Sequence, residues 1–179
     1  TTAYSLTGSN DSTLTNGIGF DSNNGGSWSF DGVDDKIAIT NGWNSNGAST
    51  CFWWRNDSSN SWDGSFFGTS NNANKVVRLL NPTVIRYYGG ANNYDYTVPT
   101  MALNTWYYCV ISDNGTGARI YLNGVESTSG LKPSQPIFID QIGRYYTGGT
   151  IYDFEGDISS VKVYNRALTA EEVLQNYNA

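Results

Sequence analysis

Clusters of glycine and asparagine interrupt this chain at short intervals, and they restrict its fold more than any other feature. They lie at residues 23–26, 44–47 and 71–74, and they are typical of turns. The segments between them are short, and several alternate apolar with polar residues, as strands with one buried face do. Asn123-Gly124 lies between two such segments and predicts a hairpin, because a type I′ turn needs positive φ at both central residues. The chain is therefore predicted to be all-β.

The predicted strands are distributed along the whole chain. The strongest is 105–112, which is rich in aromatic and β-branched residues. The others are predicted at 28–30, 37–39, 50–54, 75–80, 84–88, 94–98, 119–122, 125–127 and 157–164.

One helix is predicted, over residues 170–177 at the C-terminus. Thr169 and Glu172 have the spacing of a capping box, and Leu168 and Val173 that of a hydrophobic staple. Many short strands and one terminal helix indicate two antiparallel sheets packed face to face. We see no linker or repeat and expect a single β-sandwich domain over residues 1–179.

Composition excludes several classes of function. The net charge is −6, with 10 Lys and Arg against 16 Asp and Glu, so the basic surface of a nucleic-acid-binding protein is not expected. The chain has no His and only two Cys, which argues against a zinc site. No apolar run approaches the roughly 20 residues of a membrane span, so no membrane insertion is expected. The abundance of Asn, Ser and Thr favours an extracellular or virion-surface module.

Three segments follow one another in an order that resembles a known family. They read WSFDGVDDKI at 28–37, LNTWYYC at 103–109 followed by IYLNG at 120–124, and FEGDISSVKVYNRALTAEE at 154–172. Together they resemble the laminin-G-like, concanavalin A-like jelly-roll superfamily, most closely its bacterial and phage branch, to which the pentraxins are related. The resemblance implies a concanavalin A-like jelly roll with a short C-terminal helix.

The resemblance also implies a disulfide and a calcium site. Cys51 and Cys109 fall where pentraxins carry a disulfide, although two buried thiols are the alternative. Members of the superfamily often hold one structural Ca²⁺ between N-terminal and C-terminal segments. Here Asp31, Asp34 and Asp35 lie in one turn and Asp153, Glu155 and Asp157 in another, and Asp31, Asp34 and Asp157 are the expected ligands. Ser159 departs from the acidic residue of the family pattern, and turn acids that accept backbone N–H bonds are the alternative.

The superfamily also contains glycoside hydrolases, so paired carboxylates are a candidate feature. Asp153, Glu155 and Asp157 are two residues apart and would share one strand face, about 7 Å from one to the next. Acid–base cleavage of a glycosidic bond needs two such groups. The Glu-x-Asp-x-x-Glu motif of one large hydrolase branch is absent, and Gly156 suggests a bulge, so no enzyme is expected.

Aromatic residues in polar segments are the candidates for ligand binding. Exposed rings offer flat apolar platforms to sugars, and neighbouring amides, carboxylates and guanidinium groups supply orienting hydrogen bonds. For each ring the alternative is that it packs back onto the sandwich, and Trp28, Trp53, Trp54 and Trp106 are predicted to lie in the core. The candidates are Trp43, Trp62, Asp63, Tyr94, Tyr96, Arg144, Tyr145 and Tyr146.

The sequence thus predicts a non-catalytic carbohydrate-binding or adhesion module. Its partner would be a glycan or a host-surface polysaccharide, bound weakly at each site and strengthened by multiplicity. The alternative is a structural or decoration domain of a phage particle, or an adhesin spacer, whose partners are other virion or adhesin subunits.

Overall fold

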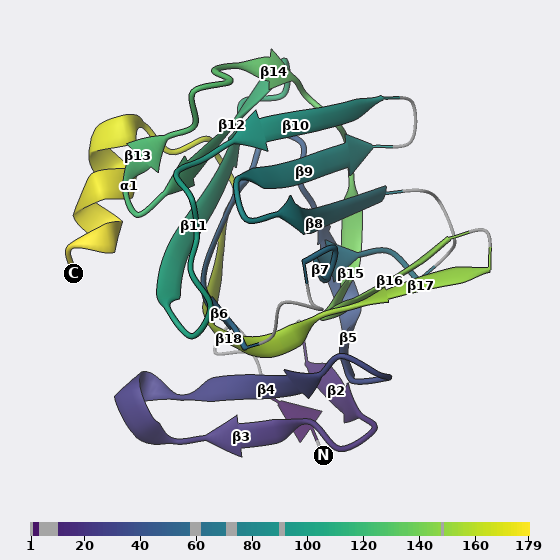
Figure 1. Ribbon diagram of the computed structural model, residues 1–179. Helices are drawn as coiled ribbons and strands as arrows, with labels where there is room; N and C mark the ends of the chain where they lie inside the picture. Colours follow the sequence, from purple (N-terminus) through teal and green to yellow (C-terminus); the bar gives the residue numbers. More distant parts are fainter. Residues whose placement is uncertain (1, 4–10, 58–61, 71–74, 90–91, 148) are drawn as a thin grey trace.

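The computed structural model describes residues 2–3, 11–57, 62–70, 75–89, 92–147 and 149–179, and within them most strands form two antiparallel sheets that pack face to face (Figure 1). Sheet 1 has the order β1 (Thr2–Ala3), β2 (Ser12–Thr15), β5 (Lys36–Asn44), β15 (Phe138–Ile142), β7 (Ser65–Gly68), β8 (Lys75–Asn81), β9 (Val84–Gly89), β10 (Asn93–Thr97). The predicted all-β sandwich is confirmed.

Sheet 2 carries the C-terminal helix on its outer face (Figure 1). Its order is β13 (Val125–Glu126), β12 (Gly117–Leu122), β11 (Trp106–Asp113), β6 (Ser49–Asn56), β18 (Glu155–Tyr164), β4 (Ser27–Asp31), β3 (Gly19–Asp21), with β14 (Lys132–Pro133) also pairing with β12. A 3₁₀ turn, η1 (Asn23–Gly25), follows β3.

A separate hairpin, β16 (Arg144–Thr147) and β17 (Thr150–Asp153), projects beyond sheet 1 (Figure 1). Its Tyr145 and Tyr152 rings stack with centroids 5.9 Å apart, and Arg78 of β8 lies 4.4 Å from the Tyr152 ring. Neither this hairpin nor the strands β2, β3, β7 and β15 are among those predicted from the sequence.

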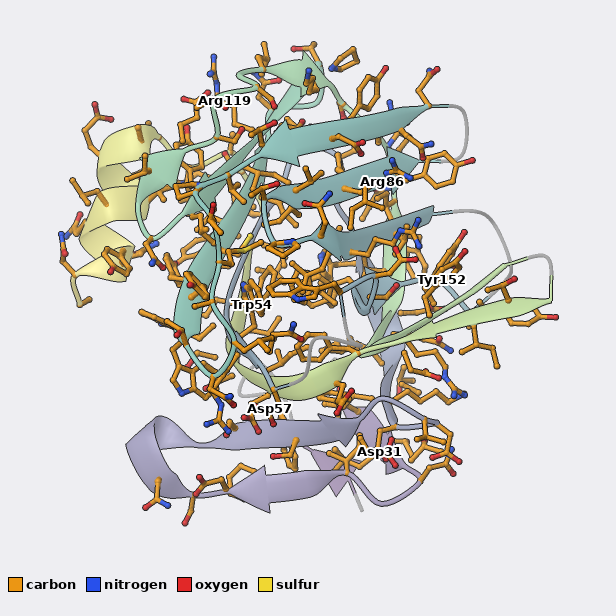
Figure 2. All side chains as sticks on the ribbon, in the orientation of Figure 1. Asp31, Trp54, Asp57, Arg86, Arg119 and Tyr152 are labelled. Carbon is orange, nitrogen blue, oxygen red and sulfur yellow. The ribbon has the colours of Figure 1, made fainter. Side chains whose placement is uncertain are left out.

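The core lies between the sheets and follows from strand alternation. On β6, Phe52 and Trp54 point inward and are fully buried, and Figure 2 shows Trp54 in the interior. On β11, Tyr107 and Cys109 belong to the same inner cluster. The residues between them, including Trp53 on β6 and Tyr108 on β11, therefore face the outside of sheet 2.

The helix α1 (Ala170–Tyr177) has the predicted bounds and covers part of this outer face. Its capping box is present: Glu172 N–H donates to Thr169 Oγ1 at 3.3 Å, and Thr169 N–H donates to Glu172 Oε2 at 2.9 Å. Arg166 donates to both carboxylate oxygens of Glu172 at 2.7 Å, which lowers the pKa of Glu172 to about 2. Under the helix lies a second apolar cluster, made of Cys51, Tyr108, Val110, Tyr121, Leu168 and Val173.

The predicted disulfide is wrong. Cys51 pairs with Val110, and Cys109 pairs with Phe52, so the two cysteines are diagonal neighbours on adjacent strands. The Cys109 side chain lies in the core between the sheets, whereas that of Cys51 lies under α1 on the opposite face of sheet 2. A disulfide needs Cβ atoms about 3.5–4.5 Å apart. Both thiols are free and buried, and burial raises the pKa of each.

We therefore expect the two thiols to be unreactive in the native protein. A thiol reagent should modify neither of them at neutral pH, and it should modify both after unfolding in denaturant. A reducing agent should leave the melting temperature unchanged. A mass two hydrogens lower under non-reducing conditions, or a melting temperature that falls on reduction, would contradict this assignment.

The described residues contain no helix long and apolar enough to cross a membrane.

Candidate functional site

The outer face of sheet 2 presents a row of side chains aligned by strand register. Trp106 of β11 lies opposite Arg55 of β6, Arg55 lies opposite Asp157 of β18, and Asp157 lies opposite Ser29 of β4. The guanidinium carbon of Arg55 is 5.7 Å from the centroid of the Trp106 ring. Across the four neighbouring strands, this row thus contains an aromatic ring, a cation, an anion and a hydroxyl, in that order.

A second row runs beside the first. Tyr108 of β11 lies opposite Trp53 of β6, and Trp53 lies opposite Ser159 of β18. The Trp53 ring contacts Tyr108, with centroids 5.2 Å apart, and stacks on Tyr177 of α1 at 5.8 Å. The helix therefore packs against the Trp53 ring through Tyr177. On the neighbouring strand β18, Trp53 has Ser159 as its partner.

These two rows and the turn after β3 enclose a pocket of about 340 Å³. Two tryptophans, one glycine and seven polar or charged residues line it. Its lining consists of Asp21, Asn23, Gly26, Ser27, Trp53, Arg55, Trp106, Asp157, Ser159 and Ser160.

The polar centre of this pocket, which we call the sheet-2 pocket, is a fixed ion pair. Arg55 donates to Asp157 Oδ2 from Nε at 2.8 Å and from Nη2 at 2.5 Å. Ser29 Oγ donates to Asp157 Oδ1 at 2.5 Å. The Asp157 side chain is 5% exposed and that of Arg55 is 35% exposed. The hydrogen bonds from Arg55 to Asp157 raise the pKa of Arg55, so the guanidinium remains charged.

The backbone beside this pair requires glycine. Gly156 has φ +135°, and a Cβ at this position would lie 2.1 Å from the Arg55 carbonyl oxygen. The missing side chain lets β18 approach β6 directly next to the ion pair. Further along β18 the register shifts between Ser159 and Lys162, and Ser160 takes a φ of +50° there. This bulge turns Ser160 toward the sheet-2 pocket.

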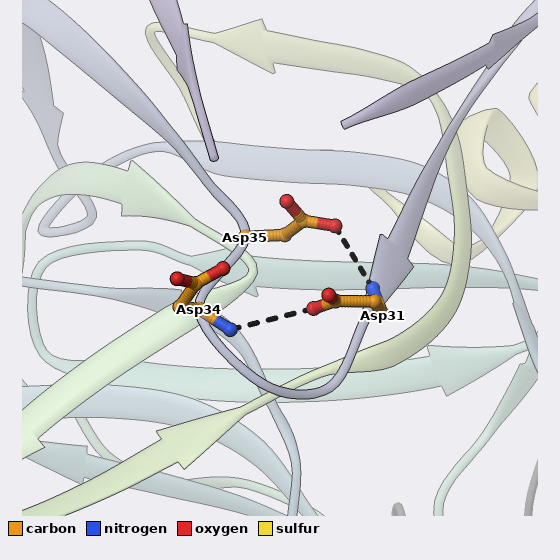
Figure 3. Close-up of side chains that lie close together, drawn as sticks. All are labelled: Asp31, Asp34 and Asp35. Atoms are coloured by element: carbon orange, nitrogen blue, oxygen red, sulfur yellow. Dashed lines mark hydrogen bonds between the residues drawn. The ribbon is translucent and has the colours of Figure 1, made fainter. Parts of the chain in front are cut away.

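A second candidate site lies in the turn between β4 and β5, where Asp31, Asp34 and Asp35 offer carboxylate oxygens within 4.8 Å of one another (Figure 3). Asp31 Oδ1 accepts hydrogen bonds from the backbone of Val33 at 2.8 Å and of Asp34 at 3.3 Å. These bonds lower the pKa of Asp31, with the bond from Val33 contributing most.

Asp35 is the buried member of this acidic turn, with 3% of its surface exposed. Its Oδ2 accepts from the Asp31 N–H at 3.0 Å, but its Oδ1 is buried and has no hydrogen-bond donor among the described residues. Burial raises the pKa of Asp35, and the carboxylates of Asp31 and Asp34 add to the rise.

Asp157, the third predicted calcium ligand, does not lie in the acidic turn. It lies two positions further along β18 than Glu155, the residue that faces Asp31. Its carboxylate is used by Arg55 and Ser29 instead. Asp35 stands with Asp31 and Asp34 in its place.

The loop aromatics predicted to bind a ligand are largely packed onto the sandwich. Trp43 is half-buried, its Nε1 donates to Thr50 Oγ1 at 3.0 Å, and its ring meets Phe67 edge-on. Trp62 and Tyr94 are also half-buried and pack against the core. Tyr96 is fully buried and its hydroxyl donates to the Ala118 carbonyl at 2.9 Å, so its ring is part of the core.

The charged candidates form ion pairs within the protein, and the two tyrosines of the doublet differ in burial. Asp63 forms an ion pair with Arg78 at 2.9 Å. Arg144 donates to Asp153 at 2.5 and 3.0 Å and to the Val33 carbonyl at 3.1 Å. Tyr145 is buried and stacks on Tyr152, whereas Tyr146 is 40% exposed. The described pocket contains none of the eight predicted residues.

Sequence reasoning missed the two tryptophans of the sheet-2 pocket. Trp53 and Trp106 were predicted to be core, yet both lie on the outer face, whereas Trp54 is core and Trp28 is partly buried against it. The signal that could have found them is alternation: Arg55 is two residues from Trp53 and must share its face.

Two of the three carboxylates considered for hydrolysis are engaged in ion pairs. Asp153 pairs with Arg144 and Asp157 pairs with Arg55. Phe154, which lies between Asp153 and Glu155, is fully buried.

Comparison with solved structures finds the same fold in proteins of low sequence identity. Domain 4 of AbnA, an extracellular arabinanase from Geobacillus stearothermophilus solved with arabinotriose, is 22% identical with a TM-score of 0.68, over 92% of this chain and 86% of that one. The sialidase of Trypanosoma rangeli is 15% identical with a TM-score of 0.74, over 98% of this chain and 30% of that one.

The binding domain of botulinum neurotoxin serotype G is 14% identical with a TM-score of 0.68, over 94% of this chain and 46% of that one. The chain thus spans less than half of the sialidase and of the toxin domain. No curated protein sequence matches it.

A family model described as the concanavalin A-like lectin/glucanases superfamily matches residues 31–174, which include most strands of both sheets and the first turn of α1. The match covers far more than half of the chain and agrees with the observed sandwich. The chain belongs to the concanavalin A-like lectin/glucanase superfamily.

Proposed function

We propose that this protein is a non-catalytic carbohydrate-binding module and that the sheet-2 pocket is its binding site. The observation that carries the proposal is the placement of Trp53 and Trp106 beside the Arg55–Asp157 pair in one pocket. Sugar rings present apolar C–H faces that pack on indole rings, and their hydroxyls both donate and accept hydrogen bonds. The pocket offers both kinds of partner.

The arrangement favours binding over cleavage. Asp157 is already engaged by Arg55 and by Ser29, so it is positioned as an acceptor for hydroxyls rather than as a proton donor to a glycosidic oxygen. Glycoside hydrolysis requires two carboxyl groups that act on the sugar together. The second carboxylate of the pocket, Asp21, accepts hydrogen bonds from the backbone and side-chain N–H groups of Asn23 at 2.9 and 2.7 Å, so it too is held as an acceptor.

The proposal extends to the setting of the module. We place residues 1–179 as one jelly-roll module of an extracellular or virion-surface protein of the bacterial and phage branch, with a glycan or host-surface polysaccharide as its partner. The fold match to a domain of an extracellular arabinanase solved with arabinotriose supports a sugar ligand. Fold alone does not define function, and the pocket therefore remains the main argument.

A glycan array tests this proposal. The protein should bind a defined subset of immobilised glycans, and the corresponding free oligosaccharides should compete. A protein that binds no glycan at any density, with calcium or with a chelator, would contradict the proposal.

One observation favours the alternative of a protein partner. Tyr146 and Ile151 lie opposite each other on the β16–β17 hairpin and are 40% and 48% exposed. Such an apolar pair on a projecting hairpin could contact a virion or adhesin subunit. The absence of glycan binding, together with self-association or subunit binding that is lost in Tyr146→Ser, would favour this alternative.

We further propose that the acidic turn holds one structural Ca²⁺. The donor set consists of oxygen atoms only, as Ca²⁺ prefers, and the buried Oδ1 of Asp35 lacks a partner among the described residues. Asp31, Asp34 and Asp35 would hold the ion and fix the turn between β4 and β5. The ion would offset two of the three negative charges and so reduce the repulsion among these carboxylates.

Calcium is therefore expected to raise the melting temperature. At about 100-fold excess over its dissociation constant, a ligand specific for the folded state adds about 2.7 kcal/mol, which corresponds to roughly 5–10 °C for a chain of this size. Asp35→Asn should remove the shift between calcium and chelator in thermal unfolding, and Glu171→Gln on α1 should retain it. Equal melting temperatures of the unmodified protein in calcium and in chelator would refute the site.

A further inference from the structure

The charges around the sheet-2 pocket are unbalanced. Asp21 and Asp157 line it together with Arg55, and Asp57 lies 3.4 Å from Arg55 Nε. Three carboxylates therefore surround one guanidinium group, and no other cationic side chain is among the described lining residues. At neutral pH the immediate surroundings carry a formal charge of −2.

The single guanidinium is already engaged. Arg55 directs both Nε and Nη2 at Asp157 Oδ2 and has Asp57 as a second anionic neighbour. Proteins usually recognise a carboxylate through a free guanidinium fork that forms two parallel hydrogen bonds. A carboxylated sugar would meet a guanidinium whose charge is already shared between Asp157 and Asp57, and it would add a further negative charge to surroundings that carry an excess of carboxylates.

Uncharged sugars face no such obstacle. Their hydroxyls can donate to the carboxylates of Asp21 and Asp157 and exchange hydrogen bonds with Ser27 and Ser160, which also line the pocket. Their ring faces can pack on Trp106. From this charge arrangement we infer that the sheet-2 pocket selects uncharged sugars and rejects sugars that bear a carboxylate, such as sialic and uronic acids. The inference rests on the proposed function and specifies its ligand class.

Matched glycan pairs test the inference. Each neutral oligosaccharide that binds is compared with the same oligosaccharide extended by one sialic acid, or oxidised to the uronate, at 20 mM and at 500 mM salt. The neutral member should bind at least tenfold more tightly at low salt. The difference in affinity between the neutral and the acidic glycan should become smaller at high salt, because salt screens repulsion between exposed charges.

Two double variants that change the net charge equally test whether the preference for neutral glycans arises at the sheet-2 pocket. Asp21→Asn with Asp57→Asn removes two carboxylates near Arg55, and the amide oxygen introduced at position 21 would keep the acceptor that Asn23 uses. This variant should lower the ratio of neutral to acidic glycan affinity at least fivefold relative to the unmodified protein. The control, Asp140→Asn with Glu171→Gln, alters the same charge elsewhere and should leave the preference unchanged.

The outcomes separate the two proposals. An acidic glycan that binds as tightly as its neutral counterpart overturns the charge selection and leaves the glycan module intact. A preference that responds equally to both double variants overturns its assignment to the sheet-2 pocket. Failure of every neutral and acidic glycan to bind overturns the proposed function and the selection together.

Discussion

Replacing Trp106 with alanine is expected to weaken glycan binding by roughly 30-fold, or about 2 kcal/mol, the usual minimum effect of removing a central aromatic anchor. Trp106 is half-buried, and the Arg55 guanidinium lies over its ring from the neighbouring strand. Its loss should therefore remove a sugar platform while leaving the core between the sheets intact. Isothermal titration with the tightest glycan from the array measures the change.

Two further variants test whether the loss of affinity is due to the Trp106 ring. Trp106→Phe should recover part of the affinity, because a smaller ring still offers an apolar face. Tyr146→Ala removes an exposed ring on the β16–β17 hairpin, outside the sheet-2 pocket, and should bind as the unmodified protein does. The assignment fails if Trp106→Ala binds normally, or if Tyr146→Ala is the variant that loses binding.

Replacing Arg55 with alanine is expected to destabilise the protein by about 2–3 kcal/mol and lower its melting temperature by roughly 5–10 °C. The variant leaves Asp157, whose side chain is 5% exposed, without its cation. Breaking a fully buried pair costs about 3–5 kcal/mol and an exposed pair about 0–1 kcal/mol. Arg55 is 35% exposed, so water can solvate part of the lost contact and the cost falls between these limits.

A matched arginine provides the control. Arg119 pairs with Glu126 on the same sheet. The Glu126 side chain is 32% exposed, against 5% for Asp157, so water can solvate it when its partner is removed, and Arg119→Ala should cost less than about 1 kcal/mol. Arg55→Gln with Asp157→Asn removes both charges and should recover most of the stability lost by Arg55→Ala. Chemical denaturation of the four proteins gives the comparison. Equal losses for Arg55→Ala and Arg119→Ala would show that the buried pair does not hold β6 to β18.

Features encoded by nearby residues were predictable. The capping box of Thr169 and Glu172 lies within four residues, and α1 begins and ends where the sequence predicts. The hairpin at Asn123-Gly124 and the strands of the core also appear as expected, because alternation and turn residues are local signals.

Features that depend on register were not predictable from one sequence. The run Phe52, Trp53, Trp54 is aromatic throughout, so hydrophobicity alone does not show that Trp53 faces outward. The disulfide between Cys51 and Cys109 was wrongly predicted for the same reason, because the strand register places Cys51 opposite Val110 rather than opposite Cys109. Trp43 reaches Thr50 on the other sheet, and this contact depends on how the sheets stack.

The most direct test follows the six tryptophan indole N–H signals by NMR during titration with a bound glycan. If the sheet-2 pocket is the site, the signals of Trp53 and Trp106 should shift and saturate together, while those of Trp43 and Trp62 stay in place. Shifts confined to Trp43 or Trp62, with Trp53 and Trp106 unchanged, would place the ligand elsewhere and contradict the account.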